Sequence, residues 1–399
     1  MKTISKSRNN GIALPLALAS VLLLLCIGVS LLELGVKNRV FVIRNTAEIS
    51  ARCAADSGLN KAIFEIRQKL QGNSWFGTEM PAESNIQLIS CNAIFDYTTT
   101  LQPDGNYLIE STGKNGVNSR TVRCVLQRKV PFETAIFADG YITLKNSGKV
   151  GSYNGTATSN FMVGTNSTKN GSVALYSSST IEGGVAVGPG GNPDDVIELK
   201  NGAEIEGDTM AMSQKNELAL PEVPQWLISL PSSGTIKNDI IISESAKYSG
   251  IDLKSGNNII VIDDVSLYIE GDLTLGNSSQ IQIEDGASLT LYLDGDLIGK
   301  NSCEINNETE IPKNLQIYGM EDCTSLDLRN GSDCYAVIYA PNAEFILHNS
   351  VTIYGAIACD TFEIKNSGQI MYDASLQDET FDPVPTDFTV KNWNESIGQ

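Results

Sequence analysis

The sequence predicts two fold classes in succession: an α+β N-terminal unit, with one long helix and a small antiparallel sheet, and then an all-β right-handed parallel β-helix (a solenoid). Three observations carry this prediction. Residues 12–32 contain no charged side chain, strand-forming segments alternate with turns over residues 85–131, and from about residue 135 short strands recur with Asn-Gly or Asn-Ser turns.

These changes of character also predict the domain boundaries. We expect a leader over 1–11, a transmembrane and amphipathic helix over 12–70, and a small antiparallel β unit over 71–134. The β-helix is expected over 135–376, and the C-terminal tail or cap over 377–399. The total of 399 residues is enough for about two or three such units.

The charge of the chain restricts its partners. The formal net charge is −19. An acidic surface repels phosphate backbones, and we identify no basic patch in the C-terminal half of the sequence. We therefore expect no nucleic-acid partner.

The apolar segment 12–32 is the first predicted element. A helix rises about 1.5 Å per residue, so this segment is long enough to cross a bilayer core of about 30 Å. Beyond it, apolar residues recur at spacings of three and four, as on one face of an α-helix. Much of that face is small, which lets another backbone or a sheet approach closely; its smallest members are Ala47, Ala51, Ala54 and Gly58.

The N-terminus resembles that of PilX-type minor pilins of type IV pili. The resemblance lies in the basic leader, Gly11 before Ile12, the long apolar helix, and the stretch 54–62, which is similar to the family's AAEAGL-type signature. It implies a class III signal peptide, cleavage by a prepilin peptidase between Gly11 and Ile12, and methylation of the new N-terminus. It also implies packing of the helix against other pilins or minor pilins.

The sequence departs from major pilins at two positions. The first mature residue would be Ile12 instead of phenylalanine, and the fifth would be Leu16, where major pilins carry a glutamate. These departures fit a tip, initiating or sparsely inserted subunit better than a repeated shaft subunit. A plain signal anchor is the alternative interpretation of the same segment.

Repeats define the C-terminal region. Residues 142–150 are similar to residues 362–370, and residues 267–273 match residues 291–297 at an offset of 291 − 267 = 24. Asparagine and glycine suit the left-handed backbone positions of tight corners, so we expect stacked coils with inward-facing Leu, Ile and Val. A β-sandwich is the competing fold. This region also resembles β-helical regions attached to some PilX-like proteins.

Two segments fall outside this repeat. The proline-rich stretch 208–236 predicts a loop lying across the solenoid and separating its coils into two runs. The tail 377–399 is expected to cap the last coil or to be loose.

Six cysteines in an exported region suggest disulfides. The pairs that we favour each lie within one module, although six cysteines allow 15 connectivities and buried free thiols are the alternative. The expected pairs are Cys91 with Cys124, Cys303 with Cys323, and Cys334 with Cys359.

No catalytic, cofactor or metal site is expected. His348 is the single histidine, which excludes chemistry that needs a pair of histidines, and its place beside a repeat turn favours a surface turn residue. We interpret the carboxylate pairs as solvated turn charges, although such pairs also serve glycosidases or hold calcium; they are Asp194 with Asp195, Asp263 with Asp264, and Asp294 with Asp296.

The predicted function is that of a pilus-associated structural subunit that is not an enzyme. It would be held by one span in the bacterial inner membrane before assembly and then displayed on the pilus or cell surface, for pilus assembly or adhesion. The alternatives are a membrane-anchored β-helical enzyme acting on polysaccharide, a type II secretion pseudopilin-like subunit, and a scaffold polymer of bactofilin type.

Overall fold

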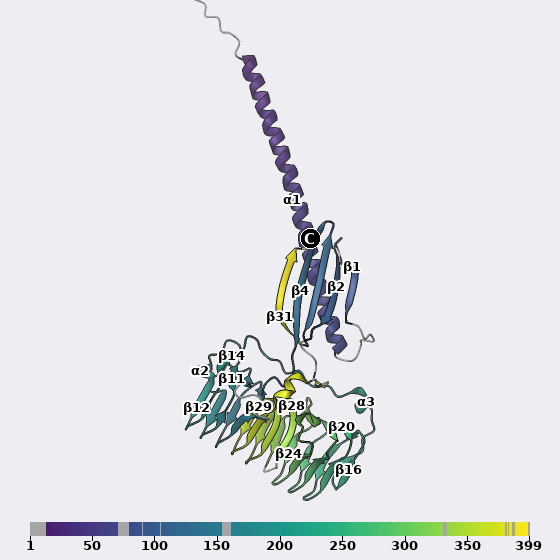
Figure 1. The fold of residues 1–399 in the computed structure, drawn as a ribbon, viewed down its shortest axis with the longest axis vertical. Helices are drawn as coiled ribbons and strands as arrows, with labels where there is room; N and C mark the ends of the chain where they lie inside the picture. The colour runs from purple at the N-terminus through teal and green to yellow at the C-terminus, as the bar shows by residue number, and fades with distance from the viewer. Residues whose placement is uncertain are drawn as a thin grey trace, which may run out of the picture. The chain divides into compact units, whose positions relative to one another are not determined.

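The computed structural model describes residues 13–70, 80–89, 91–103, 105–153, 161–329, 333–379, 381, 383–384 and 388–397. These residues form two units. The first, here called the helix–sheet unit, comprises the described residues up to Arg128 together with 388–397; the second, called the coil stack, comprises those from Lys129 to Val384 (Figure 1).

The helix–sheet unit consists of one helix, α1 (Ala13–Leu70), and a five-stranded antiparallel sheet in the order β1-β2-β3-β4-β31. The strands are β1 (Ala82–Gln87), β2 (Ile94–Leu101), β3 (Tyr107–Asn115), β4 (Asn118–Arg128) and β31 (Phe388–Ile397). The predicted long helix and antiparallel sheet are confirmed.

Strand β31 corrects the prediction for the tail. We expected it to cap the last coil or to be loose, yet Phe388 pairs with Arg128 and Ile397 pairs with Arg120 along β4. Trp393 and Val390 give this segment the aromatic and β-branched character of a strand. Because Arg128 and Phe388 are paired, the chain leaves the sheet and returns to it at the same place.

Small residues allow α1 to lie against the sheet. Ala51, Ala54, Ala55 and Ala62 are fully buried, and the first two belong to the small face that the sequence predicts. A Cβ placed on Gly113 of β3 would lie only 2.0 Å from the backbone oxygen of Ala51, so the strand and the helix touch backbone to backbone. This contact buries the large residues of the sheet, including Phe95, Tyr97 and Ile109.

The coil stack is built from short strands in two runs. The first run comprises β5 (Ile136–Ala138), β6 (Ile142–Leu144), β7 (Lys149–Ser152), β8 (Met162–Thr165), β9 (Val173–Tyr176), β10 (Thr180–Ile181), β11 (Gly184–Val187), β12 (Ile197–Lys200), β13 (Glu204–Ile205) and β14 (Thr209–Ala211), with the short helix α2 (Pro193–Val196) before β12.

The second run comprises β15 (Thr235–Ile236), β16 (Ile240–Ile242), β17 (Ala246–Tyr248), β18 (Gly250–Leu253), β19 (Asn258–Val261), β20 (Asp264–Ile269), β21 (Leu273–Leu275), β22 (Gln280–Ile283), β23 (Ser288–Leu293), β24 (Leu297–Gly299), β25 (Glu304–Asn307), β26 (Leu315–Gly319), β27 (Ser325–Leu328), β28 (Cys334–Leu347), β29 (Thr352–Ile364) and β30 (Gln369–Tyr372). The 3₁₀ turns η1 (Pro312–Asn314) and η2 (Ala374–Asp378) lie in or just after this run.

Parallel pairing stacks these strands. Leu267 lies beside Leu291, and Ile142, Thr143 and Leu144 lie beside Phe362, Glu363 and Ile364, so the sequence repeats are strands that are neighbours in space. The predicted parallel β region is confirmed, and the parallel pairing excludes the β-sandwich alternative, whose sheets are antiparallel. Alternate residues are buried as a continuous apolar ladder, part of which is Leu328, Leu347, Ile364, Leu144 and Leu175.

Polar corners separate the strands. Asn146, Asn349 and Asn201 have φ values of 51°, 44° and 57°, which is the left-handed conformation that asparagine tolerates. The Asn146 side-chain amide donates to the Asn366 carbonyl oxygen at 2.8 Å, and the Asn366 amide donates to that of Asn349 at 2.9 Å. The corners of adjacent coils are therefore linked by side-chain hydrogen bonds.

The chain does not fill the coil stack from one end to the other. Strands β5 and β6 pair with β29, and β7 pairs with β30, so the first coil lies directly against the last one, in the middle of the stack (Figure 1). The first run extends from there to one end, and the second run begins at the other end and returns. The Tyr372 hydroxyl donates to the Phe132 carbonyl at 2.8 Å, joining the beginning and the end of the unit.

The proline-rich segment makes the long connection between the two runs. The Asn216 N–H donates to the Asn166 side chain at 2.9 Å, and Ala219 accepts from the Tyr339 hydroxyl at 2.9 Å. Farther on, the short helix α3 (Gln225–Ile228) contacts β17 and β20. The segment therefore lies across coils of both runs.

Candidate functional site

The first candidate site is the apolar N-terminal half of α1. Its large side chains are exposed in the structure; Leu14, Leu24 and Leu32 retain 78%, 65% and 72% of their accessible surface. The helix is long and apolar enough to cross a membrane, with a mean hydropathy of 2.5 in its most apolar window. This surface can be buried by lipid or by other apolar helices.

The residues predicted for processing, Gly11 and Ile12, lie outside the described residues. The described helix begins one residue later, at Ala13. The described part of α1 therefore lies wholly after the predicted cleavage point.

The predicted disulfides are absent, because the structure has all six of these cysteines as free thiols. Cys334 lies beside Ile353, whereas Cys359 lies beside Ala340. Ala340 lies six steps along β28 from Cys334, which is about 20 Å along a strand and far beyond disulfide reach.

In each of the other two expected disulfides, the two cysteines also lie at different places in the fold. The Cys303 sulfur lies beside Gly299 and the Cys323 sulfur beside Gly319, so they line different coil interiors. Cys124 is level with Ile109 on β3, while Cys91 precedes the start of β2. Burial raises the pKa of Cys323 and of Cys334 to about 12, which keeps both thiols protonated at neutral pH.

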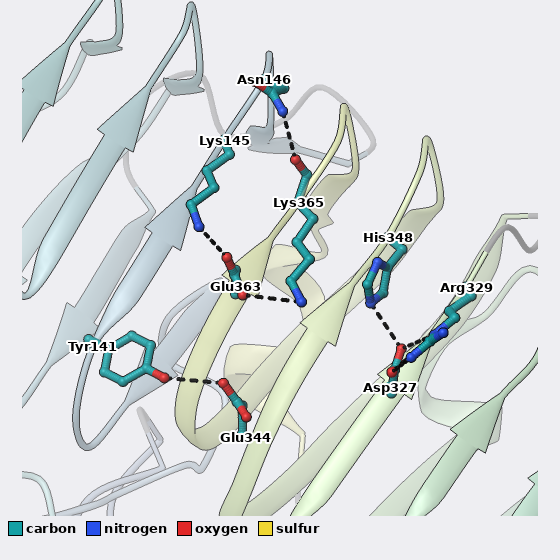
Figure 2. Close-up of polar contacts among 9 residues, drawn as sticks. All are labelled: Tyr141, Lys145, Asn146, Asp327, Arg329, Glu344, His348, Glu363 and Lys365. Atoms are coloured by element: carbon teal, nitrogen blue, oxygen red, sulfur yellow. Dashed lines mark hydrogen bonds and ion pairs between the residues drawn. The ribbon is translucent and has the colours of Figure 1, made fainter.

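The second candidate site is a charged outer face of the coil stack, formed by β27, β28, β29 and β6 (Figure 2). The Lys145 Nζ lies 2.5 Å from the Glu363 Oε1, and the Lys365 Nζ lies 3.7 Å from the other oxygen of the same carboxylate. The Arg329 Nη2 lies 2.5 Å from the Asp327 Oδ2. The Lys145–Glu363 pair joins coils that are far apart in the sequence, whereas the other two pairs each lie within one coil.

His348 belongs to this face. Its Nε2 lies 3.1 Å from the Asp327 Oδ1. Burial lowers the pKa of His348, and Asp327 offsets that effect in part. The imidazole is therefore neutral at neutral pH and lies against the carboxylate without adding a charge.

Of the carboxylate pairs considered as catalytic or calcium-binding alternatives, Asp294 with Asp296 has structural partners at both residues. Asp296 accepts hydrogen bonds from the backbone N–H groups of Thr324 and Ser325 at 2.9 and 2.8 Å, and Asp294 accepts from the Tyr268 hydroxyl. Among the described residues, no group of three or more His, Cys, Asp or Glu side chains is placed to hold a metal ion.

Comparisons with known proteins give three results. A family model described as "Domain of unknown function (DUF7305)" matches residues 243–379, which covers most of the second run of coils and about a third of the chain. No curated protein matches the chain.

Two solved structures are similar in part. The competence-associated pilin ComZ from Thermus thermophilus is 13% identical over 89% of this chain and 98% of that one, with a TM-score of 0.23. An ice binding protein from an Antarctic bacterium, Flavobacteriaceae, is 10% identical over 60% and 80%, also with a TM-score of 0.23. At these TM-scores neither likeness carries an argument about fold or function.

Proposed function

We propose that this chain is a minor pilin-like structural subunit of a type IV pilus, of the PilX type. One observation carries the proposal: a single helix has an exposed apolar half suited to lipid or to other pilin helices, and a second half held by an antiparallel sheet of the same chain. The apolar half would hold the subunit in the inner membrane and then pack against other pilins in the assembled fibre.

The coil stack is proposed as the displayed part, for assembly or adhesion, and as non-catalytic. Its interior is filled by apolar side chains, and Asp294 and Asp296 already accept hydrogen bonds at its corners. We propose that the coils wind as a right-handed β-helix, the hand that parallel crossovers adopt in nearly all proteins.

The mature N-terminus tests this proposal. The full chain is produced in a bacterium with and without its prepilin peptidase, and the purified protein is measured by mass spectrometry. We expect a methylated N-terminus at Ile12 when the peptidase is present, and a retained leader in a Gly11→Val control. A leader retained in both strains would mean a signal anchor and would overturn the proposal.

A second measurement separates this function from the enzyme alternative. Release of sugar from acidic and neutral polysaccharides is compared between the wild-type chain and Asp263→Ala. We expect no turnover by either protein. Turnover by the wild type that is lost in the variant would identify a polysaccharide-active enzyme.

A further inference from the structure

The strand register of the coil stack brings together a row of basic side chains that the sequence analysis missed. The same corner position recurs in nine successive coils: it is the residue just after β18, β21, β24, β27, β28, β29 and β6, and the last residue of β9 and β12. Its occupants, here called the corner row, are Lys254, Gly276, Lys300, Arg329, His348, Lys365, Lys145, Tyr176 and Lys200.

Backbone hydrogen bonds confirm that the register continues to this row. The backbone N–H of Lys300 donates to the carbonyl oxygen of Leu275. In the same way, the N–H of His348 donates to the Leu328 carbonyl, and the N–H of Lys145 donates to the Ile364 carbonyl. Adjacent strands lie about 4.8 Å apart, so eight steps give a row of about 38 Å. Six of its nine positions are lysine or arginine, in a chain of net charge −19.

The row has more cations than its neighbouring carboxylates can balance. Two residues earlier on the same strands, the outward positions hold four carboxylates: Asp252, Asp327, Glu363 and Glu198. The difference is 6 − 4 = 2 positive charges. Lys300 has no ion-pair partner within the described part of the chain, and the Lys254 and Lys145 side chains remain 62% and 44% exposed.

A more distant row is acidic. Asp272, Asp296 and Glu344 lie two residues farther back, about 13 Å from the corner row along the strand direction. That distance exceeds the screening length of about 8 Å at physiological salt. The far side of the corner row holds uncharged turns instead, including the hydrogen-bonded amides of Asn146, Asn349 and Asn366.

We propose that the corner row binds a linear acidic polysaccharide lying along the coil axis. The lysines would pair with sugar carboxylates that recur along the polymer, while the asparagines and the neighbouring carboxylates would bind its hydroxyl groups. The side-chain hydrogen bonds between corners hold the row in place before the ligand binds. This lowers the conformational entropy that the protein loses on binding. This inference deepens the proposed function by naming a ligand class for the displayed part.

Nucleic acid fits the same row less well. Duplex DNA carries one charge per about 1.7 Å, several times the density of cations in the corner row. Single-stranded nucleic acid needs aromatic platforms for its bases. Tyr176 and His348 are the only aromatic side chains among the nine positions, and they are not adjacent in the row.

The test uses the full chain in detergent micelles, with immobilised polygalacturonate, duplex DNA and uncharged dextran as probes. The variant Lys145→Gln/Lys300→Gln/Lys365→Gln removes three charges from the row. The control Lys149→Gln/Lys215→Gln/Lys313→Gln removes three charges from lysines of the same unit that pair with Glu182, Asp139 and Glu379. Both variants have the same net charge, and thermal unfolding checks that both are folded.

We expect the wild type to bind polygalacturonate, more weakly at high salt, and not to bind dextran. The row variant is expected to lose about tenfold or more in affinity and the control less than about twofold, because three surface contacts are removed together. Absence of polygalacturonate binding at low salt, or equal losses in both variants, would overturn the inference. Tighter binding to DNA than to polygalacturonate would assign the row to nucleic acid instead. None of these outcomes depends on leader cleavage, so the inference and the proposed function can fail separately.

Discussion

The two halves of α1 form surfaces of opposite kinds. In the N-terminal half the apolar side chains are large and exposed, as at Leu24 and Leu32, whereas in the C-terminal half those that face the sheet are buried, both small ones such as Ala54 and large ones such as Leu59. Small residues are required where the backbones meet, because a Cβ on Gly113 would lie 2.0 Å from the Ala51 backbone oxygen. Exposure of the apolar side chains therefore distinguishes the half of α1 that is free to contact lipid or another helix from the half that the sheet covers.

The largest effect is expected from charges placed on the exposed half. Leu24→Arg/Ile27→Arg should prevent membrane insertion, because each arginine at the centre of a span costs about 2.5–3.5 kcal/mol on insertion scales. Fractionation of cells measures the membrane-bound share of the protein. Leu101→Arg, at an exposed site on β2, is the control and should remain membrane-bound. An unchanged distribution of the double variant would show that this half does not span the membrane.

One substitution made in both halves sharpens the comparison. A Cβ on Gly58 would lie 2.3 Å from the Ser111 Oγ and 2.7 Å from Phe95, whereas a Cβ on Gly35 would have no atom within 4 Å. Leucine favours helix over glycine at both sites, so only packing differs. We expect Gly58→Leu to destabilise the helix–sheet unit by about 3 kcal/mol or more and Gly35→Leu to leave it unchanged.

Limited proteolysis of the detergent-solubilised chain in a denaturant series measures this difference, with cleavage of the sheet strands as the signal. Equal protection of the two glycine variants would mean that the sheet does not hold α1 as closely as the structure describes.

The coil stack extends the comparison to buried and exposed isoleucines. Ile364 is fully buried between Leu347 and Leu144, so Ile364→Ala should cost about 2–5 kcal/mol through lost burial and the cavity left behind. Ile298, on the outer side of β24, is 37% exposed, and Ile298→Ala should cost less than about 1 kcal/mol. Chemical denaturation followed by tyrosine fluorescence compares them, and similar midpoints would contradict the stacked interior.

The smallest perturbation concerns the cysteines. Cys53 is exposed on α1, whereas Cys323 is buried with its pKa raised to about 12. Because alkylation requires the thiolate, iodoacetamide should label Cys53 first and Cys323 only on unfolding. Peptide mass spectrometry after labelling at about pH 8 identifies the order.

The same shift predicts a pH effect. As pH rises above the ordinary value of 9.0, the thiol ionises in the unfolded chain before it does so in the folded one, so the coil stack should lose stability toward about pH 12. The free thiols can be tested separately by weighing the native protein before and after reduction. A mass change would show that the protein contains disulfides.

Local patterns allowed much of this fold to be predicted. The apolar run before Leu32 and the alanines after it define α1 and the face that the sheet covers, because a helix fixes which residues share a side. The similarity of residues 142–150 to 362–370 identified strands that are neighbours in space. The turn residues Asn146, Asn201 and Asn349 have the left-handed backbone that was expected, whereas in other turns the following serine adopts it, as Ser367 does after Asn366.

The features that the sequence analysis missed depend on contacts between residues that are far apart in the chain. Nothing near Phe388 indicates that its partner is Arg128, since 259 residues separate them in the chain (388 − 128 − 1 = 259). The corner row was visible as Lys-Asn in the repeats at Lys145, Lys200 and Lys365, but its alignment depends on pairing between the two runs. The cysteine pairs were chosen by module, whereas register along the strands decides which sulfurs can meet.

The central claim is that the exposed half of α1 packs against other pilin helices outside the membrane. Photo-cross-linking tests it most directly, with p-benzoylphenylalanine at Leu24, and at the 99% exposed Val117 as control, in cells that assemble pili. We predict that the Leu24 probe cross-links to pilin subunits in sheared surface fibres and that the Val117 probe does not. Cross-linking at Leu24 confined to the membrane fraction, with no product in the fibres, would contradict the account.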